Sequence, residues 1–479
     1  MKALIMRLMQ FAIGSLGSAV LNLMTIPVIT FFLSPEEYGK TSMFMLVQTL
    51  LICVIYLGFD QAFAREFYEY PNKQKLLSTA MVIPFLFSGV VIGLMCGFAK
   101  PISSFLFGSL VHYHVVYLIA ASVPFLIFER FLFLYVRMQN KALEFSLFNI
   151  LVKLSILVCT VLFLLFFPHT FITVIYATII GQVLGDTILM IRNVRSLYMN
   201  PMKTDPYLYP RLAKFGLPIA IATVIYSLFV IIDKLFLRYF CDFDELGLYT
   251  AAFKIASALL ILQTTFSNFW IPTAYEWYKK QKPMRYFKLV SDSIMFLIAI
   301  LFMGLLLFKG VILMVLSPEY SQAQYIFPFL CFYPLMMTVS DTTNLGIVFL
   351  KRSSLNILVS VIALIVAIGL NFLLVPTYGA IGASVATGSA YIAFFLARTY
   401  FSMRIWHGFS VKSHLITTSL LVVAVSLNTL IHTVWLISLI NIIFLLGIVT
   451  VYLPLLRTLY RSYCARKQPA NIEKKGMKL

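Results

Sequence analysis

Eight ionisable side chains inside long apolar segments are the residues of this sequence best placed to do chemistry. They are the bases Arg130, Lys153, Lys234 and Lys254 and the acids Glu129, Asp186, Asp233 and Asp341. A charge near the centre of a bilayer costs about 3 kcal/mol unless it faces a partner or a wet cavity. Each of these residues therefore contacts a ligand, pairs with another charge inside the membrane, or extends its charged end toward an interface.

The depth of each residue within its apolar segment bears on these interpretations. Lys153 lies about eight residues into its segment, or about 12 Å deep at 1.5 Å per residue of helix. Asp341 lies in a polar run, 338–344, that a lipid-facing helix would not tolerate. Lys234 and Asp186 lie near enough to a segment end to reach the interface. We interpret the four bases as candidate binding residues, and the four acids as candidate coupling residues or ion-pair partners.

Transmembrane helices are the elements that must position these side chains. Of the 479 residues, 61% are hydrophobic and 11% are charged, against about 25% charged in soluble proteins. So few charges exclude a soluble enzyme and a disordered chain. Apolar runs of about 20 residues, the length that crosses a bilayer as a helix, predict an all-α polytopic membrane protein with about 14 spans. The predicted spans are 10–33, 41–63, 78–98, 112–134, 145–167, 170–191, 215–236, 247–273, 289–308, 326–349, 355–375, 378–399, 415–431 and 436–456.

The basic residues are divided unevenly between the two sides that these spans create. Of the 37 Lys and Arg residues, the loops of one side hold only Lys40, Lys100, Arg238 and Lys309. Because positively charged loops are retained in the cytoplasm, we expect both termini to be cytoplasmic. The net charge of +19 then comes from the basic loops that set the orientation of the chain in the membrane. We expect the basic tail at 458–479 to face lipid headgroups rather than nucleic acid.

Repeated patterns indicate that two parts of the chain are copies of one another. Arg7-Leu8-x-x-Phe11 recurs as Arg211-Leu212-x-x-Phe215, Pro124-Phe125-Leu126-x-Phe128 as Pro328-Phe329-Leu330-x-Phe332, and Glu37-x-Gly39 as Glu245-x-Gly247. Each copy holds an even number of spans, so the copies have the same orientation and are related by an axis along the membrane normal. We predict six-helix lobes at 1–203 and 204–410, two added helices at 411–457 and a cytoplasmic tail at 458–479.

The sequence lacks the patterns of catalytic, metal and nucleotide sites. Its six cysteines have no CxxC spacing, and His112-x-His114 has no third ligand at a suitable spacing. A phosphate-binding GxxxxGK[ST] loop is missing. The loops on the side with few cations are short and offer no platform for catalytic acids. We therefore expect no enzyme activity, no bound metal and no cofactor.

Four short motifs together point to a known family. They are Leu33-Ser34-Pro35-Glu36-Glu37-Tyr38-Gly39, Gly58-x-Asp60-x-Ala62-x-x-Arg65-x-x-Tyr68, Lys214-Phe215-Gly216-Leu217-Pro218 and Gly247-x-Tyr249-x-x-Ala252-x-Lys254-Ile255. With these motifs the chain resembles the Wzx-type oligosaccharide flippases of the multidrug/oligosaccharidyl-lipid/polysaccharide exporter superfamily. The resemblance extends from the first to about the twelfth of the predicted spans, each about 20 residues long.

The resemblance implies a function as well as a fold. Two lobes would surround a cationic cavity and move undecaprenyl-diphosphate-linked oligosaccharide repeat units across the bacterial cytoplasmic (inner) membrane by alternating access, for O-antigen or capsule assembly. Lys153 and Lys254 would supply the charge of this cavity, and membrane lipids, a polysaccharide polymerase and a chain-length regulator would be further partners. Whether protons or sodium ions drive the transport stays open at this point.

Three alternatives also stay open. Lipid II flippases carry cations in their first two helices, whereas this chain has no charge from Leu8 to Pro35 or from Thr41 to Phe59. Cation-coupled multidrug exporters commonly have twelve helices and an acid within the first or seventh helix, whereas Asp233 lies at the end of the seventh predicted span. A membrane scaffold of a polysaccharide assembly complex, without transport activity, would not need the cations inside the spans.

Overall fold

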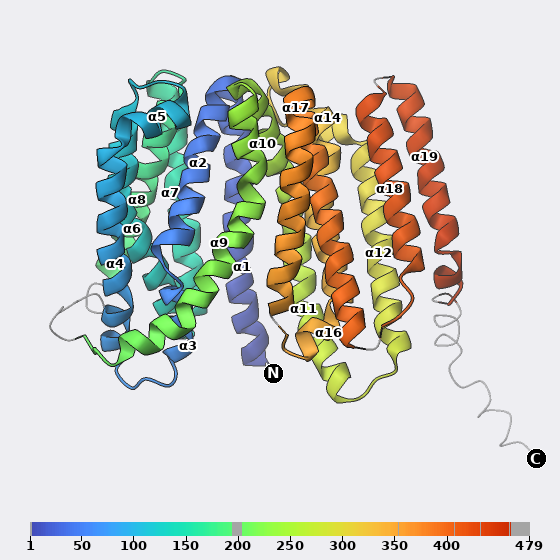
Figure 1. Cartoon of the computed structure of the whole chain (residues 1–479), viewed down its shortest axis with the longest axis horizontal. Helices are drawn as coiled ribbons and strands as arrows, with labels where there is room; N and C mark the ends of the chain where they lie inside the picture. The colour runs from blue at the N-terminus through green and yellow to red at the C-terminus, as the bar shows by residue number, and fades with distance from the viewer. Residues whose placement is uncertain are drawn as a thin grey trace, which may run out of the picture.

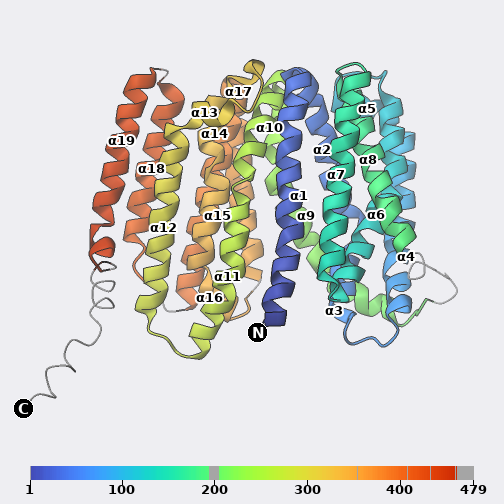
Figure 2. The same cartoon turned by 180° about the vertical axis from the view of Figure 1, so that it is seen from behind.

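The computed structural model of the chain is a wide bundle of helices that lie at more than one depth (Figures 1 and 2). It describes residues 2–193, 204–352, 354–406, 408–431, 433–458 and 460, and these residues form no strand. The first helix begins and the last one ends at the same edge of the bundle, which we call the lower edge; the opposite edge is the upper edge (Figures 1 and 2). Residues 194–203 of the connection between the sixth and seventh predicted spans, and all of the predicted basic tail except residues 458 and 460, lie outside the described residues.

Eight helices make up the part of the chain before this connection. They are α1 (Lys2–Phe32), α2 (Pro35–Ile55), α3 (Phe59–Glu66), α4 (Lys73–Gly97), α5 (Ala99–Phe107), α6 (Tyr113–Met138), α7 (Ala142–Phe166) and α8 (Phe171–Arg192). The start of α2 follows from its sequence, because the Ser34 hydroxyl accepts a hydrogen bond from the backbone N–H of Glu37 and Pro35 occupies the first turn. Glu36 and Glu37 lie in that turn, as predicted, where carboxylates interact favourably with the helix dipole.

The remaining helices follow the connection. They are α9 (Leu208–Phe240), α10 (Phe243–Ser257), α11 (Leu260–Lys279), α12 (Met284–Leu307), α13 (Lys309–Leu313), the 3-10 turn η2 (Pro318–Tyr320), α14 (Ala323–Leu330), α15 (Phe332–Thr343), α16 (Leu345–Phe349), α17 (Ser354–Ile405), α18 (Lys412–Leu430) and α19 (Val434–Val451). The long α17 consists of two arms that meet at Gly379, whose φ of 55° lies in the left-handed region.

The spans match the prediction in number. Eleven helices are long and apolar enough to cross a membrane. One of these eleven, α17, consists of two arms and accounts for two spans. Together with the shorter apolar helices Leu16–Phe32 and Trp435–Val451, the described helices account for all of the predicted spans. Figure 1 shows α5, the start of α2 and the end of α9 at the upper edge, and Figure 2 shows α13 near the same edge. These segments contain the four cations assigned to the cation-poor side.

Several predicted boundaries are wrong. The expected span at 41–63 is interrupted because Leu57 and Gly58 both have left-handed φ values, of 49° and 72°, so α3 is a separate helix. The spans at 247–273 and 326–349 are likewise divided, into α10 and α11 and into α14, α15 and α16. The upper-edge loops at 99–111 and 309–325 contain the helices α5 and α13. Hydropathy marks where the chain is apolar, but it does not mark where a helix bends.

At the upper edge the two parts of the chain touch through reciprocal backbone contacts. A Cβ atom added to Gly39 would clash with the carbonyl oxygen of Phe243, and one added to Gly247 would clash with that of Pro35. Glu37 accepts a hydrogen bond from the N–H that begins α8 (2.7 Å), and Glu245 accepts one from the N–H of Ala380 in α17 (2.6 Å). These matched contacts are those that two parallel copies related by a two-fold axis would make.

At the lower edge a second glycine pair brings the same two parts together. A Cβ atom on Gly58 would clash with the carbonyl oxygen of Gly216, and one on Gly216 would lie 2.9 Å from the carbonyl of Gly58. Beside this pair, the guanidinium of Arg65 lies over the Phe215 ring, 4.3 Å from its centroid. All four motifs that carry the family resemblance thus contribute to the contacts between α2, α3, α9 and α10.

Candidate functional site

Three lysines from the two parts of the chain lie near one another in the interior. Lys153 belongs to α7, Lys234 to α9 and Lys254 to α10. Lys254 lies within electrostatic range of both Lys153 and Lys234. All three residues are half-buried.

These lysines have no direct counter-charge among the described residues. Within the described part of the chain, none of them lies within 4.0 Å of a carboxylate oxygen. The ammonium of Lys234 is placed instead over the ring of Phe253, 5.9 Å from its centroid. Like charges in a medium of low dielectric repel strongly, and an anion with more than one charge would relieve the repulsion. The three lysines are therefore suited to bind such an anion.

Two of the predicted acids, Glu129 and Asp186, lie near Lys153. Glu129 on α6 accepts a hydrogen bond from the amide of Gln182 on α8 (3.0 Å), and Gln48 on α2 donates to the Gln182 carbonyl (3.5 Å). Asp186 is fully buried, and neither of its oxygens has a hydrogen-bond partner. Both acids interact electrostatically with Lys153. A buried carboxyl group without donors is far less costly when it carries a proton.

Asp233 lies in a buried polar cluster between α9, α10 and α17. One carboxylate oxygen accepts from the amide of Asn371 (2.6 Å), and the other accepts from the hydroxyl of Tyr249 (3.0 Å). The same hydroxyl is 2.9 Å from that of Thr387. Asp233 is therefore fixed by hydrogen bonds and does not form an ion pair with the adjacent Lys234.

Two other predicted residues do form ion pairs. Arg130 on α6 donates from Nε and Nη2 to one oxygen of Asp60 on α3, at 2.9 and 2.7 Å. Asp341 on α15 pairs with Arg398 on α17 at 3.2 Å and accepts a hydrogen bond from Gln263 at 2.7 Å. The structure thus brings Arg130 and Asp341 to partners other than the three lysines. Their roles in substrate binding and in coupling stay predictions.

Arg130 nevertheless faces a cavity. A space of about 150 Å³ lies between α2, α3 and α6 on one side and α9 on the other. Its lining includes Tyr56, Asp60 and Arg130 from the first part of the chain and Thr223 from the second. The side chain of Arg130 is 40% exposed, so solvent in this cavity can reach its guanidinium group.

Ion pairs and a hydrogen bond join the two parts of the chain at the lower edge. Arg211, at the start of α9, forms ion pairs with Glu66 (2.6 Å) and with Glu69. Tyr70 donates a hydrogen bond to Asp205 (2.7 Å). This hydrogen bond holds the pKa of the Asp205 carboxyl below its ordinary value. Both contacts join the turn after α3 to the chain segment that leads into α9.

Sequence reasoning missed several polar residues of these networks, Asp60, Arg398, Gln48 and Gln182 among them. Asp60 was present in a quoted motif without an assigned role, and Arg398 lies at the end of the predicted span 378–399. Gln48 and Gln182 carry no charge, so nothing in the sequence distinguished them from other polar residues. Within the described residues there is no group of three or more His, Cys, Asp or Glu residues that could hold a metal ion.

The sequence matches the family described as "Polysaccharide biosynthesis protein" over residues 10–277, which is more than half of the chain. This chain belongs to that family. The match spans α2 to α10 and so includes the glycine contacts at both edges and the three lysines.

A curated relative carries a related name. The chain is 23% identical over 163 residues to "Probable low-salt glycan biosynthesis flippase Agl15" of Haloferax volcanii (strain ATCC 29605). The match covers 33% of this chain and 34% of that protein, so the chain spans about a third of the length of this relative.

Solved structures of transporters share the fold. "Lipid II flippase MurJ, inward closed conformation" is similar with a TM-score of 0.72 at 16% identity, over 95% of this chain and 99% of that one. An inward-facing multidrug resistance MATE family transporter of the MOP superfamily is similar with a TM-score of 0.63 at 14% identity, over 81% and 94% of the two chains. The expected all-α polytopic fold is confirmed. The named proteins are flippases and transporters rather than enzymes, in agreement with the expectation from the sequence.

Proposed function

We propose that this protein is a flippase that moves undecaprenyl-diphosphate-linked oligosaccharide repeat units across a bacterial cytoplasmic membrane. The observation that carries the proposal is a set of three lysines, Lys153, Lys234 and Lys254, contributed by both parts of the chain. Among the described residues, none of the three has a direct counter-charge. A diphosphate supplies several negative charges and strong acceptor oxygens, so it fits such a set in a water-poor interior. Membership of the polysaccharide biosynthesis protein family supports a glycan as the group that the diphosphate carries.

We propose that the lobes at 1–203 and 204–410 alternate between opening at the upper and the lower edge. The Gly39–Gly247 contact would close one edge, and the Gly58–Gly216 contact together with Arg211 would close the other. Bistable packing of this kind allows a ligand to shift the population between two states. The lipid tail would stay in the bilayer, because exposing it to a wet cavity costs about 0.8 kcal/mol per methylene.

The lower edge is proposed to be cytoplasmic, because most of the basic loops lie there. In sealed cells, a membrane-impermeant thiol reagent should label Ser321→Cys at the upper edge and should not label Asn72→Cys at the lower edge; both positions are exposed. Labelling of Asn72→Cys but not Ser321→Cys would reverse the orientation. A polymerase and a chain-length regulator are the proposed partners on the side where the repeat units emerge.

Coupling to protons or sodium ions is proposed to involve the acids near the lysines. Asp186 and Glu129 lie beside Lys153, and Asp233 lies beside Lys234. Because Asp186 has no hydrogen-bond donor, Asp186→Asn should fold like the parent. If the proton on this group drives transport, the same variant should lose the response of transport to a proton gradient. Transport by this variant that still follows the gradient would exclude Asp186 as the coupling residue.

The proposed substrate is tested by deleting the gene that encodes the protein. A strain that lacks it, and has no redundant transporter, should retain lipid-linked repeat units on the cytoplasmic leaflet and lose its surface polysaccharide. Its tolerance to drugs should be unchanged. Normal surface polysaccharide would contradict the proposal, and a loss of drug tolerance would favour the second candidate, a multidrug exporter, which the similarity to the MATE fold keeps in consideration.

A further inference from the structure

The cavity between α2, α3, α6 and α9 contains an ion pair that uses only part of each partner. Nε and Nη2 of Arg130 both donate to the same carboxylate oxygen of Asp60, Oδ2. The amide of Gln61 donates to that oxygen as well (3.0 Å). Among the described residues, Oδ1 of Asp60 and Nη1 of Arg130 have no hydrogen-bond partner, although Asp60 is only 5% exposed. Both residues line the cavity, so it contains one free acceptor and one free donor.

The charges in the cavity favour a neutral ligand. Among the described residues that line it, only Arg130 and Asp60 are charged, and their charges cancel. The cavity therefore lacks the excess positive charge of the three lysines, and an anion would meet the free carboxylate oxygen. A hydroxyl group can both donate and accept a hydrogen bond. A neutral ligand with several hydroxyl groups can thus satisfy both partners without breaking the ion pair.

The size and the walls of the cavity suit one sugar ring. Its volume is about 150 Å³, whereas a water molecule takes about 30 Å³ in the liquid. The cavity therefore holds a few water molecules or a single ring, but no oligosaccharide. Ile219 and Ala220 of α9 form an apolar wall, against which the C–H face of a pyranose can pack. Apolar walls with a few fixed polar groups are typical of small-molecule sites.

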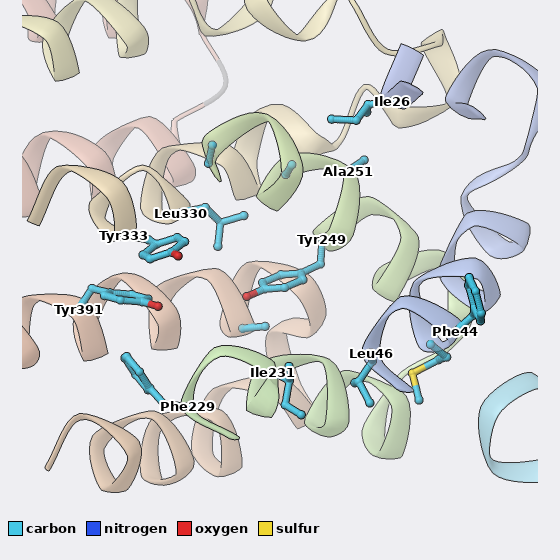
Figure 3. Close-up of a cluster of buried hydrophobic side chains, with 14 of the residues drawn as sticks. Ile26, Phe44, Leu46, Phe229, Ile231, Tyr249, Ala251, Leu330, Tyr333 and Tyr391 are labelled. Carbon is cyan, nitrogen blue, oxygen red and sulfur yellow. The ribbon is translucent and has the colours of Figure 1, made fainter. Parts of the chain in front are cut away.

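The fold that the two halves share does not require an ion pair at this place. Arg130 follows the first copy of the repeated Pro-Phe-Leu motif, and the residue at the matched position of the second copy is Pro334. The adjacent Tyr333 packs on Tyr391 with ring centroids 4.3 Å apart, and Figure 3 shows both rings within the buried cluster of the second half. The second half is thus apolar and aromatic where the first half has charges.

The cavity lies between the lysines and the lower edge. Thr223, which lines it, stands eleven residues before Lys234 on α9, or about 16 Å along the helix axis. Gly58, which also lines it, contacts Gly216 at the lower edge. A separation of about 16 Å is longer than one sugar ring. A ring in the cavity is therefore not the one bonded directly to a diphosphate at Lys234.

We propose that this cavity is a glycan subsite, which binds one sugar ring of the repeat unit beyond the ring attached to the diphosphate. Hydroxyl groups of this ring donate to Oδ1 of Asp60 and to the carbonyl oxygen of Gln61, and another accepts from Nη1 of Arg130. The subsite selects for a glycan, whereas the lysines select for the diphosphate. This inference rests on the proposed function, because the lysines must hold the diphosphate while the ring occupies the cavity.

A native cysteine reports whether the cavity is occupied. Cys53 lines the cavity and is half-buried. In a full chain with Cys53 as its only cysteine, the rate of reaction with methyl methanethiosulfonate is measured with undecaprenyl diphosphate or with the undecaprenyl-diphosphate-linked repeat unit extracted from cells that make the protein. At ten times its Kd, the linked repeat unit should slow the reaction about tenfold, because about nine-tenths of the chains are occupied. Undecaprenyl diphosphate should leave the rate unchanged, and equal rates with the two lipids would overturn the subsite.

Two variants test the polar contacts. Arg130→Lys keeps a charge beside Asp60 but loses the guanidinium fork, and Gln61→Met removes an amide at an exposed position. By native mass spectrometry, each should weaken binding of the linked repeat unit about 2- to 10-fold, as expected for one net hydrogen bond, and leave undecaprenyl diphosphate unchanged. Arg137→Lys, at an exposed position in the last turn of α6, is the matched control.

The outcomes separate this subsite from the proposed function. An equal loss for both lipids, or no loss for either, in the folded variants would overturn the glycan subsite. Failure of the parent to bind either lipid, or unchanged binding of both by Lys254→Gln, would instead contradict the proposed function.

Discussion

Alanine at Gly39 or Gly247 should hold the upper edge open. Gly39 has no space for a side chain, because its Cβ atom would meet the carbonyl oxygen of Phe243 and lie 2.9 Å from the carbonyl carbon and 3.2 Å from the nitrogen of Gly247. All three are backbone atoms, so no side chain can rotate away. Real Cβ contacts essentially never fall below 3.0 Å, so α2 and α10 must separate before the methyl group fits.

The size of the effect follows from the cost of overpacking, which is about 1–3 kcal/mol for one added carbon atom in a packed interior. This cost applies only to the state with a closed upper edge. It therefore shifts the population toward the state with an open upper edge by about 5- to 150-fold. The assay is the rate at which a membrane-impermeant thiol reagent, added at the upper edge, labels Lys254→Cys in a chain without other cysteines.

Labelling should accelerate in Gly39→Ala and in Gly247→Ala, and transport should slow because the cycle cannot complete. Gly93→Ala is the control, since a Cβ atom on Gly93 meets no heavy atom within 4 Å. Parental labelling rates in both test variants, with parental melting temperatures, would refute the proposal that this contact opens.

Three further outcomes are expected. Gly216→Ala at the lower edge should accelerate labelling of Lys254→Cys from that edge in inverted vesicles, and an unchanged rate there would show that the lower contact does not gate access. Arg398→Gln should lower the melting temperature, because an unpaired buried charge costs about 3–5 kcal/mol; Asp341→Asn in the same chain should restore most of the loss, and a lack of restoration would argue against a structural pair. The hydrogen bond accepted by Asp205, whose pKa is lowered in the folded chain, is present above the ordinary carboxyl value of about 3.9 and is lost only as the pH falls through the lower folded value. The rate of labelling from the lower edge, divided by the rate for an exposed reference cysteine at the same pH to remove the change in thiolate fraction, should therefore be flat in the parent from about pH 5 to 8, and a step in this ratio would contradict the assignment.

The spans were predictable because membrane insertion depends on local apolar length, which sequence shows directly. The positions where the predicted spans divide into separate helices were not predictable, because they depend on contacts between residues that are far apart in the sequence. Gly58 adopts a left-handed conformation where α3 meets Gly216 of α9. The motifs quoted from the sequence, by contrast, contain the glycines of both edges, because close backbone approach restricts the residue type at those positions, although sequence alone assigned them no role.

The site was predictable in part for a similar reason. Lys153 and Lys254 stood out because charge is rare inside apolar segments. The ion pair of Arg130 was not readable, because its partner is 70 residues away. Nor could sequence select Phe253 among 44 phenylalanines, because only the fold places the ammonium of Lys234 over its ring.

The central claim is that the unpaired lysines bind the diphosphate during transport. It is tested most directly by the rate at which lipid-linked oligosaccharide becomes accessible on the far leaflet of proteoliposomes, per molecule of inserted protein, for Lys153→Gln and Lys254→Gln. Lys279→Gln, at an exposed position at the end of α11, is the control. Loss of one charged hydrogen bond of about 1.5–3 kcal/mol should slow transport by about 10- to 150-fold, and the Lys→Arg variants should retain part of the activity. Parental rates in both glutamine variants would contradict the account.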